Sequence, residues 1–222
     1  GKVFKNALLS DRNFARLKMV HILSMAPEVA VKTVAIRNAI RKIIVDIPDN
    51  AASLPALSLE KFHNLSEVEF SHFYGDDLLL LKGLTEISKI TIGHCPNLIS
   101  LNGIESANKL QKLDIQSWNG GAPLQNVSAL ANKPQLNEVD IYSYSDDCGF
   151  VDNVEFICTL PNATTFNACI SSSADLSPLF RAPWIKYADL KFDGPEFDAA
   201  NFNQLERLKI QLPDLQITKK SK

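Results

Sequence analysis

The chain of 222 residues lacks the marks of a membrane-spanning, zinc-binding or disulfide-rich protein. Its most apolar run, LLLLKGL at 78–84, is far shorter than the roughly 18 residues needed to cross a bilayer. The four cysteines, at 95, 148, 158 and 169, form no CxxC pair, and the N-terminus has no signal-peptide pattern. We therefore expect no membrane span and a reducing, cytoplasmic location, with secretion or delivery into a host cell as the alternative.

The motifs of the common enzyme classes are also missing. The sequence has no G-x-S-x-G, no Walker phosphate loop and no H-E-x-x-H, and it offers only four histidines as general bases. We predict that the protein is not an enzyme and has no catalytic residue, metal or cofactor. His72 and His94 fall at the same position of adjacent repeats, but the sequence shows no third ligand beside them.

Charge is spread unevenly along the chain. Residues 1–42 carry a net charge of +7, which leaves −9 for the rest. Helical spacing predicts one helix from an N-cap at Ser10 to Pro27 and a second over about residues 28–41. This basic pair is either an N-terminal cap or the remnant of an upstream domain. Its Lys and Arg residues are typical of a solvated face, so nucleic acid is not the expected partner.

A phrase of the form LxxLxL recurs along most of the chain. Clear copies begin at Leu65, Ile87, Leu110 and Leu136, and weaker ones at Ile40, Ala163, Ile185 and Leu205. Successive copies lie 20 to 27 residues apart, which is typical of one leucine-rich repeat. Within the second clear copy, the alternation Ile90-Thr91-Ile92 predicts a short strand, and the three-residue spacing after Cys95 predicts a helical or 3-10 return.

These repeats resemble the leucine-rich-repeat family, in particular its short 22-residue type found in internalins and many bacterial proteins. Ser128–Leu130 and Asp175–Leu179 resemble the convex phrase of that type. The resemblance implies an α/β solenoid with a curved parallel sheet on its concave side and short helices, 3-10 turns and loops on its convex side. We expect seven to eight coils over residues 43–217, followed by a basic tail at 218–222.

The family usually has Asn or Cys three places after the last Leu of the strand. Cys95 fits this position, and Ser171 or Asp193 could fill it. The aromatic residues Phe73, Trp118 and Tyr144 do not fit, which leaves the register of their coils open.

Stacked strands would turn one exposed residue from each coil into a column on the concave sheet. The acidic members of that column are Glu69, Asp114, Asp140 and Asp189, and aromatic residues follow the strands near one rim, among them His94, Trp118, Tyr142 and Tyr144. Charged and aromatic residues together are typical of binding hot spots. The alternative is that the acids serve solubility and that Phe73 and Trp118 are buried in irregular turns.

We therefore predict a non-catalytic module that binds a protein partner, basic or of mixed charge, on its concave face and rim. The alternative is a sensor or regulatory segment of a larger signalling or effector protein. An enzyme is the least favoured hypothesis.

Overall fold

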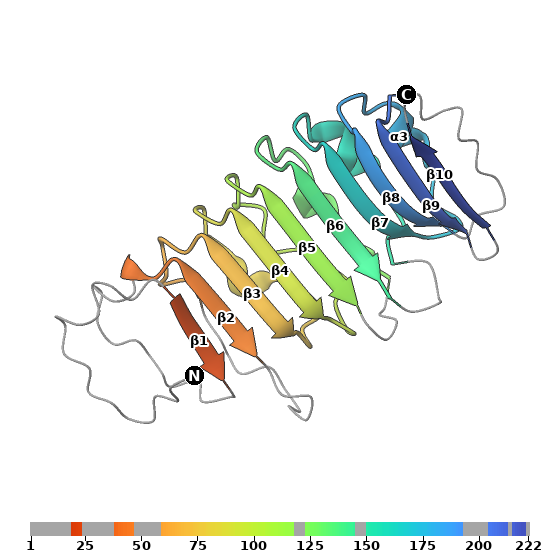
Figure 1. The fold of residues 1–222 in the computed structure, drawn as a ribbon. Helices are drawn as coiled ribbons and strands as arrows, with labels where there is room; N and C mark the ends of the chain where they lie inside the picture. Colours follow the sequence, from red (N-terminus) through yellow and green to blue (C-terminus); the bar gives the residue numbers. More distant parts are fainter. Residues whose placement is uncertain are drawn as a thin grey trace.

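The structure, a computed structural model, describes residues 19–23, 38–46, 59–117, 123–144, 150–192, 204–212 and 215–220. Ten strands form one sheet in chain order (Figure 1). All neighbouring strands are parallel except the last pair. The strands are β1 (Met19–Leu23), β2 (Lys42–Asp46), β3 (Glu67–His72), β4 (Lys89–His94), β5 (Lys112–Ser117), β6 (Glu138–Ser143), β7 (Thr165–Ile170), β8 (Tyr187–Phe192), β9 (Arg207–Leu212) and β10 (Leu215–Lys220).

Alternation of apolar and polar residues builds each strand. In β4, Ile90 and Ile92 are fully buried, while Lys89 and Thr91 are half-buried on the other face. The register places Ile90 between Val68 of β3 and Leu113 of β5. Because this pattern repeats from coil to coil, the second and fourth residues of the strands form two buried columns that run the length of the solenoid.

Short helical turns close the coils on the opposite side. They are the 3-10 turns η1 (Leu79–Leu81), η2 (Ser128–Leu130) and η3 (Glu155–Thr159) and the helix α3 (Ser177–Phe180). An Asp or Asn side chain at residue 77, 126, 153 or 175 accepts the N–H two residues further on, which starts each turn. The convex phrases at 128–130 and 175–179 are thus confirmed.

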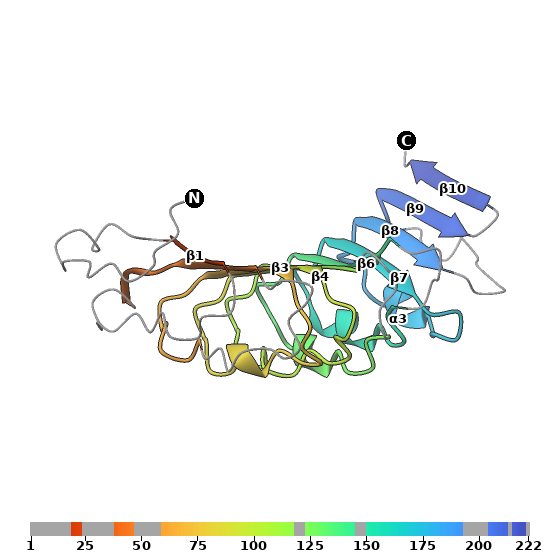
Figure 2. The same ribbon diagram turned by 90° about the horizontal axis from the view of Figure 1, so that it is seen from below.

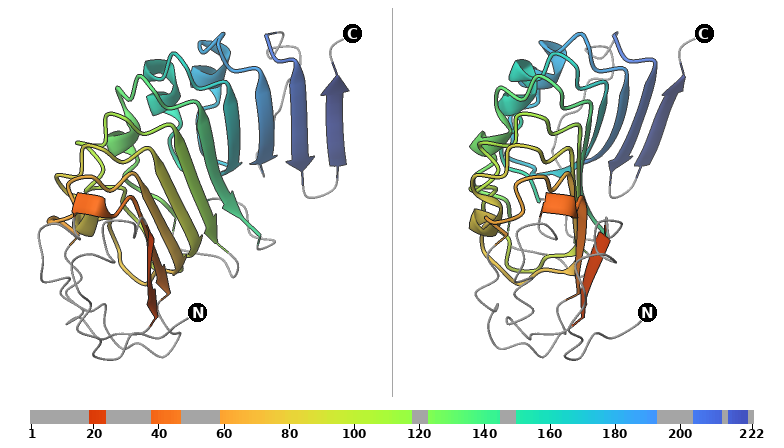
Figure 3. Two further views of the ribbon diagram at one scale, coloured as in Figure 1. Left: turned by 60° about the vertical axis from the view of Figure 1, so that its left-hand side comes forward. Right: turned by 90° about the vertical axis from the view of Figure 1, so that its left-hand side faces the viewer.

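The solenoid architecture is confirmed. Figure 2 shows the sheet along one side, curving away from the turns, and Figure 3 shows each coil as a strand on one side and a turn on the other. The apolar core fills the space between sheet and turns. Within the ranges that the structure describes, no helix is long and apolar enough to cross a membrane.

The helix predicted from Ser10 to Pro27 is wrong for Met19–Leu23, which form β1 and pair in parallel with β2. This short apolar run fits a strand as well as a helix, and pairing with the edge of β2 satisfies its backbone groups, which decides between the two. The sheet therefore includes residues on the N-terminal side of position 43. Of the second expected helix, only Asn38 and Ala39 are helical among the four residues described.

Part of the expected basic tail lies within the described structure, and residues 221 and 222 lie outside it. Its residues Thr218–Lys220 form the end of β10, which pairs antiparallel with β9. A two-residue connection at 213–214 favours this hairpin over a further coil, because a parallel return needs a dozen or more residues.

Candidate interaction face

The third residue of each strand faces away from the core and forms the column predicted from the repeats. The strand register places each member beside the next in the order Glu69, Thr91, Asp114, Asp140, Asn167, Asp189 and Lys209. Asp114 and Asp140 are therefore neighbours. Glu69 and Asp189 lie toward opposite ends of the column.

The acids toward the two ends of the column are paired with lysines of neighbouring strands. Lys42 Nζ lies 2.9 Å from Glu69 Oε2, and Lys209 Nζ lies 3.0 Å from Asp189 Oδ2. The hydrogen bond from Lys42 to Glu69 is the main cause that raises the pKa of this lysine. These charges are largely neutralised within the face itself.

The two central acids lack such a cation. Among the described residues, no Lys, Arg or His forms an ion pair with Asp114 or Asp140. Gln116 Nε2 donates to Asp114 Oδ1 at 2.9 Å, and Asn167 Nδ2 makes a long contact of 3.5 Å to Asp140 Oδ2. The nearby Lys112 is bound to Glu138 instead. Burial, and next the charge of Asp114, raise the pKa of Asp140 to about 6.

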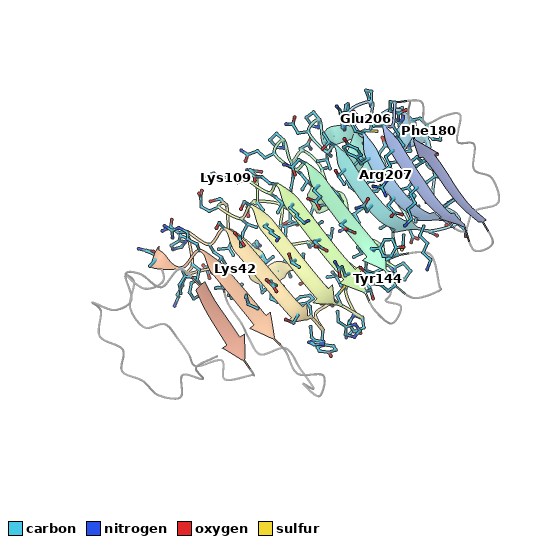
Figure 4. All side chains as sticks on the ribbon, in the orientation of Figure 1. Lys42, Lys109, Tyr144, Phe180, Glu206 and Arg207 are labelled. Carbon is cyan, nitrogen blue, oxygen red and sulfur yellow. The ribbon has the colours of Figure 1, made fainter. Side chains whose placement is uncertain are left out.

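Two tyrosines adjoin this acidic pair at the end of β6. The rings of Tyr142 and Tyr144 have centroids 5.2 Å apart and are inclined by 61°. Tyr144 is 54% exposed, and its pKa is raised first by burial and then by the charges of Asp140 and Asp114. In Figure 4, Tyr144 lies at the edge where the strands end, whereas Lys109 and Glu206 lie at the edge where they begin.

A second aromatic group lies at the ends of β3 and β4. The ring centroids of His72 and His94 are 5.9 Å apart, and those of Tyr74 and His94 are 6.1 Å apart. Phe73 is absent from this rim because it is fully buried and packs on Phe70. Trp118 lies outside the described residues.

The position that the family fills with Asn or Cys is described for four coils. Ser171 is half-buried there, with its hydroxyl oxygen 3.1 Å from that of Ser173, whereas Asp193 lies outside the described residues. Cys95 is buried, with Sγ 3.8 Å from the carbonyl oxygen of Gln116, and burial raises its pKa to about 12. Phe73 fills the same place with an apolar ring. Tyr144 instead faces outward, and the residue buried at this strand end is the preceding one, Ser143.

Sequence reasoning missed Lys42 as part of this face. Lys42 precedes Ile43 as Glu67 precedes Val68, and the register makes Lys42 and Glu67 partners. This correspondence is visible in the sequence. Because the repeat that begins at Ile40 is weak, however, the expected N-terminal cap extends to residue 42 and includes this lysine.

The fold is that of known leucine-rich-repeat proteins. No protein-family model and no curated protein matches the sequence. Similar solved structures include an internalin, InlF, from Listeria monocytogenes, with a TM-score of 0.56 and 14% identity over 81% of this chain and 49% of that one. Internalin C2 from the same organism has a TM-score of 0.51 and 21% identity over 81% of this chain and 84% of that one. The chain spans about half the length of the first structure.

At these identities the similarity shows a leucine-rich-repeat solenoid fold. Within the described ranges, no group of three or more His, Cys, Asp or Glu side chains is placed to hold a metal ion.

Proposed function

We propose that this leucine-rich-repeat solenoid is a protein-binding module that holds a basic segment of its partner on the exposed face of β5 and β6. Asp114 and Asp140 are the core of this site, and Tyr142 and Tyr144 form its border. Glu69, Asp189 and His94 lie outside this core, so we expect them to contribute less.

The observation that carries the proposal is the difference in pairing along the acidic column. Lysines of the same face neutralise Glu69 and Asp189, whereas no cation pairs with Asp114 and Asp140 in the described structure. The two adjacent carboxylates repel each other: the pKa of Asp140 is raised first by burial and next by the charge of Asp114, and the charge of Lys112 offsets this only in part. A Lys or Arg side chain of a partner would relieve that repulsion, and close charge pairs across an interface couple by about 1.5–7 kcal/mol.

The tyrosines add a second element that favours a cation. The negative face of an aromatic ring attracts Lys and Arg, and Tyr144 lies close enough to both aspartates for their charges to raise its pKa. Tyrosine is also enriched at binding hot spots because it covers a large area with few rotatable bonds. A basic side chain could therefore contact carboxylates and an aromatic ring together.

The test is selection of a random peptide library on the immobilised chain at low salt. We expect enrichment of peptides that contain Lys or Arg, and weaker binding of the selected peptides as salt screens the charges. In the double variant Asp114→Asn, Asp140→Asn, affinity should fall by about ten-fold or more, equal to about 1.4 kcal/mol.

Asp189→Asn is the matched control, because it removes one charge from the same column at a position already paired with Lys209. This variant should bind the selected peptides as the unaltered chain does. Enrichment of acidic or purely apolar peptides would contradict the proposal, as would equal affinity for the unaltered chain and the double variant.

A further inference from the structure

Two places on the exposed face carry the same arrangement: the first residue of one strand is a lysine, and the first and third residues of the next strand are acids. The register places the lysine beside the first acid, and the third-position acid lies diagonally from it. Given the spacing of strands and the rise per residue, the lysine and the diagonal acid are roughly 8 Å apart at Cα. A lysine side chain spans that distance, so each lysine has two carboxylates within reach. The two sets are Lys42 with Glu67 and Glu69, and Lys112 with Glu138 and Asp140.

The two lysines pair differently. Lys42 Nζ lies 2.9 Å from the third-position acid Glu69 and 3.8 Å from the first-position acid Glu67. Lys112 instead donates to the first-position acid Glu138, and Asp140 has no ion pair among the residues that the structure describes. Exposure does not explain the difference, because the two lysine side chains are 30% and 31% exposed.

The length of the third-position acid accounts for the difference. Glu69 has one methylene group more than Asp140, so its carboxylate reaches further along the diagonal toward the lysine. Lys112 nevertheless lies close to the acidic pair. Its pKa is raised first by the hydrogen bond to Glu138, and the charges of Asp114 and Asp140 add to that increase. Lys112 is thus a cation beside the pair that Glu138 holds outside it.

We propose that Glu138 is a positioning residue that keeps Lys112 off Asp114 and Asp140 and so leaves these carboxylates open to a basic segment of a partner. This role rests on the proposed function of the acidic pair, for which Lys112 is an internal competitor. A change that releases the lysine from Glu138, or that lengthens the acid at position 140, should let it occupy the site. The pairing at β2 and β3 shows the arrangement that the closed site would have.

The first test lengthens the acid without changing its charge. In Asp140→Glu, Lys112 should pair with the longer side chain, and the peptides selected on the unaltered chain should bind about five-fold more weakly, the equivalent of one partly exposed ion pair. Asp189→Glu is the matched control, because it lengthens an acid of the same column that Lys209 already neutralises. This control should bind as the unaltered chain does. Unchanged affinity of Asp140→Glu would overturn the proposal, since charge alone predicts no change.

A second background separates competition by the lysine from a change of shape. When Lys112→Gln is already present, Asp140→Glu should cost no affinity, because the competing cation is gone. The cost of Asp140→Glu in the two backgrounds therefore measures the coupling between positions 112 and 140. An equal loss in both backgrounds would come from the longer side chain itself and would refute the part given to Lys112.

The third test involves no partner. The carboxyl carbon of Asp140 can be titrated by nuclear magnetic resonance in Glu138→Gln, with and without Lys112→Gln. The lysine released from position 138 should lower the pKa of Asp140 by about one pH unit relative to the variant that lacks it. With Glu138 in place, removal of Lys112 should change this pKa by less.

The titration and the peptide selection can fail separately. Differences of equal size with and without Glu138 would show that the lysine does not move, and the positioning role would be lost. If no peptides with Lys or Arg are enriched, the proposed function itself is overturned, whatever the titration shows.

Discussion

The coils of β3 and β4 end differently from those of β5 and β6. In the first two, the fifth and sixth strand residues are half-exposed and the seventh, Phe73 or Cys95, is buried. In β5 and β6 the alternation continues, so that the sixth residue, Ser117 or Ser143, is buried. Tyr144, the seventh residue after β6 begins, faces outward. One repeat pattern thus supports two kinds of strand end.

A close backbone approach accompanies the first kind of end. At Gly93, an added Cβ would lie 2.6 Å from the carbonyl oxygen of Ser71, the residue that the pairing of β2 with β3 skips. The difference decides which side chains reach the surface. The early coils leave His72 and His94 half-exposed at the strand end, whereas the later coils place Tyr142 and Tyr144 there.

The largest effect on stability is expected at the seventh position after the strand begins, where the β3 coil buries Phe73 and the β6 coil exposes Tyr144. Phe73→Ala should lower the free energy of unfolding by about 3–5 kcal/mol, because a fully buried ring leaves a cavity. Tyr144→Ala, at the corresponding position but exposed, should change it by less than about 0.5 kcal/mol. Urea unfolding of both variants measures the contrast, and similar losses would show that the two ends are equivalent.

Gly93→Ala should be the next most damaging change. The added methyl group meets the backbone of Ser71, which cannot move as a side chain can, so we expect a loss of about 1–3 kcal/mol. Gln116→Ala, at the fifth position of β5, should cost no more than about 1 kcal/mol through its lost hydrogen bond to Asp114. Unchanged thermal stability of Gly93→Ala would mean that the close approach is not a constraint.

The column should respond to pH at Asp140. The pKa of Asp140 is raised to about 6 in the folded chain, so the folded state binds more protons than the unfolded state between about pH 4 and 6, and stability rises as pH falls through that range. Asp140→Asn should therefore stabilise the chain at pH 7, on the order of 1 kcal/mol after solvent screening. The gain should disappear near pH 4.

Glu69→Gln is the comparison for this variant, because Glu69 is paired with Lys42. We expect a loss of about 0–1 kcal/mol at pH 7 and no gain. Unfolding curves at pH 4 and pH 7 separate the two cases. Equal behaviour of the two variants would contradict the difference in pairing along the column.

The smallest effect concerns the buried serine at the end of β5. The hydroxyl of Ser117 is buried and has no hydrogen-bond partner in the described structure. Burial of this hydroxyl costs its hydrogen bonds to water without a replacement in the protein. Ser117→Ala removes that cost, so it should be neutral or stabilise the chain by up to about 1 kcal/mol. A clear loss in thermal unfolding would show that this hydroxyl has a partner.

Much of the fold could be predicted from the sequence repeat. The residue order of each LxxLxL phrase correctly predicted the buried columns and the register that sets Asp114 beside Asp140. It failed at the ends, where β1 and β10 form because an open sheet edge offers hydrogen-bond partners that no local pattern announces. Whether these acids bind a partner stays a prediction, as does the role of Trp118, which lies outside the described residues.

The sequence by itself determined the solenoid and its acidic column, since both follow from a period that each coil repeats. Only the tertiary structure decided which acids are already paired, because Lys42 and Lys209 reach Glu69 and Asp189 from neighbouring coils. It also decided that Phe73 enters the core while Tyr144 stays outside. The position of a strand end depends on contacts with the next coil, and so does the ring contact between His72 and His94.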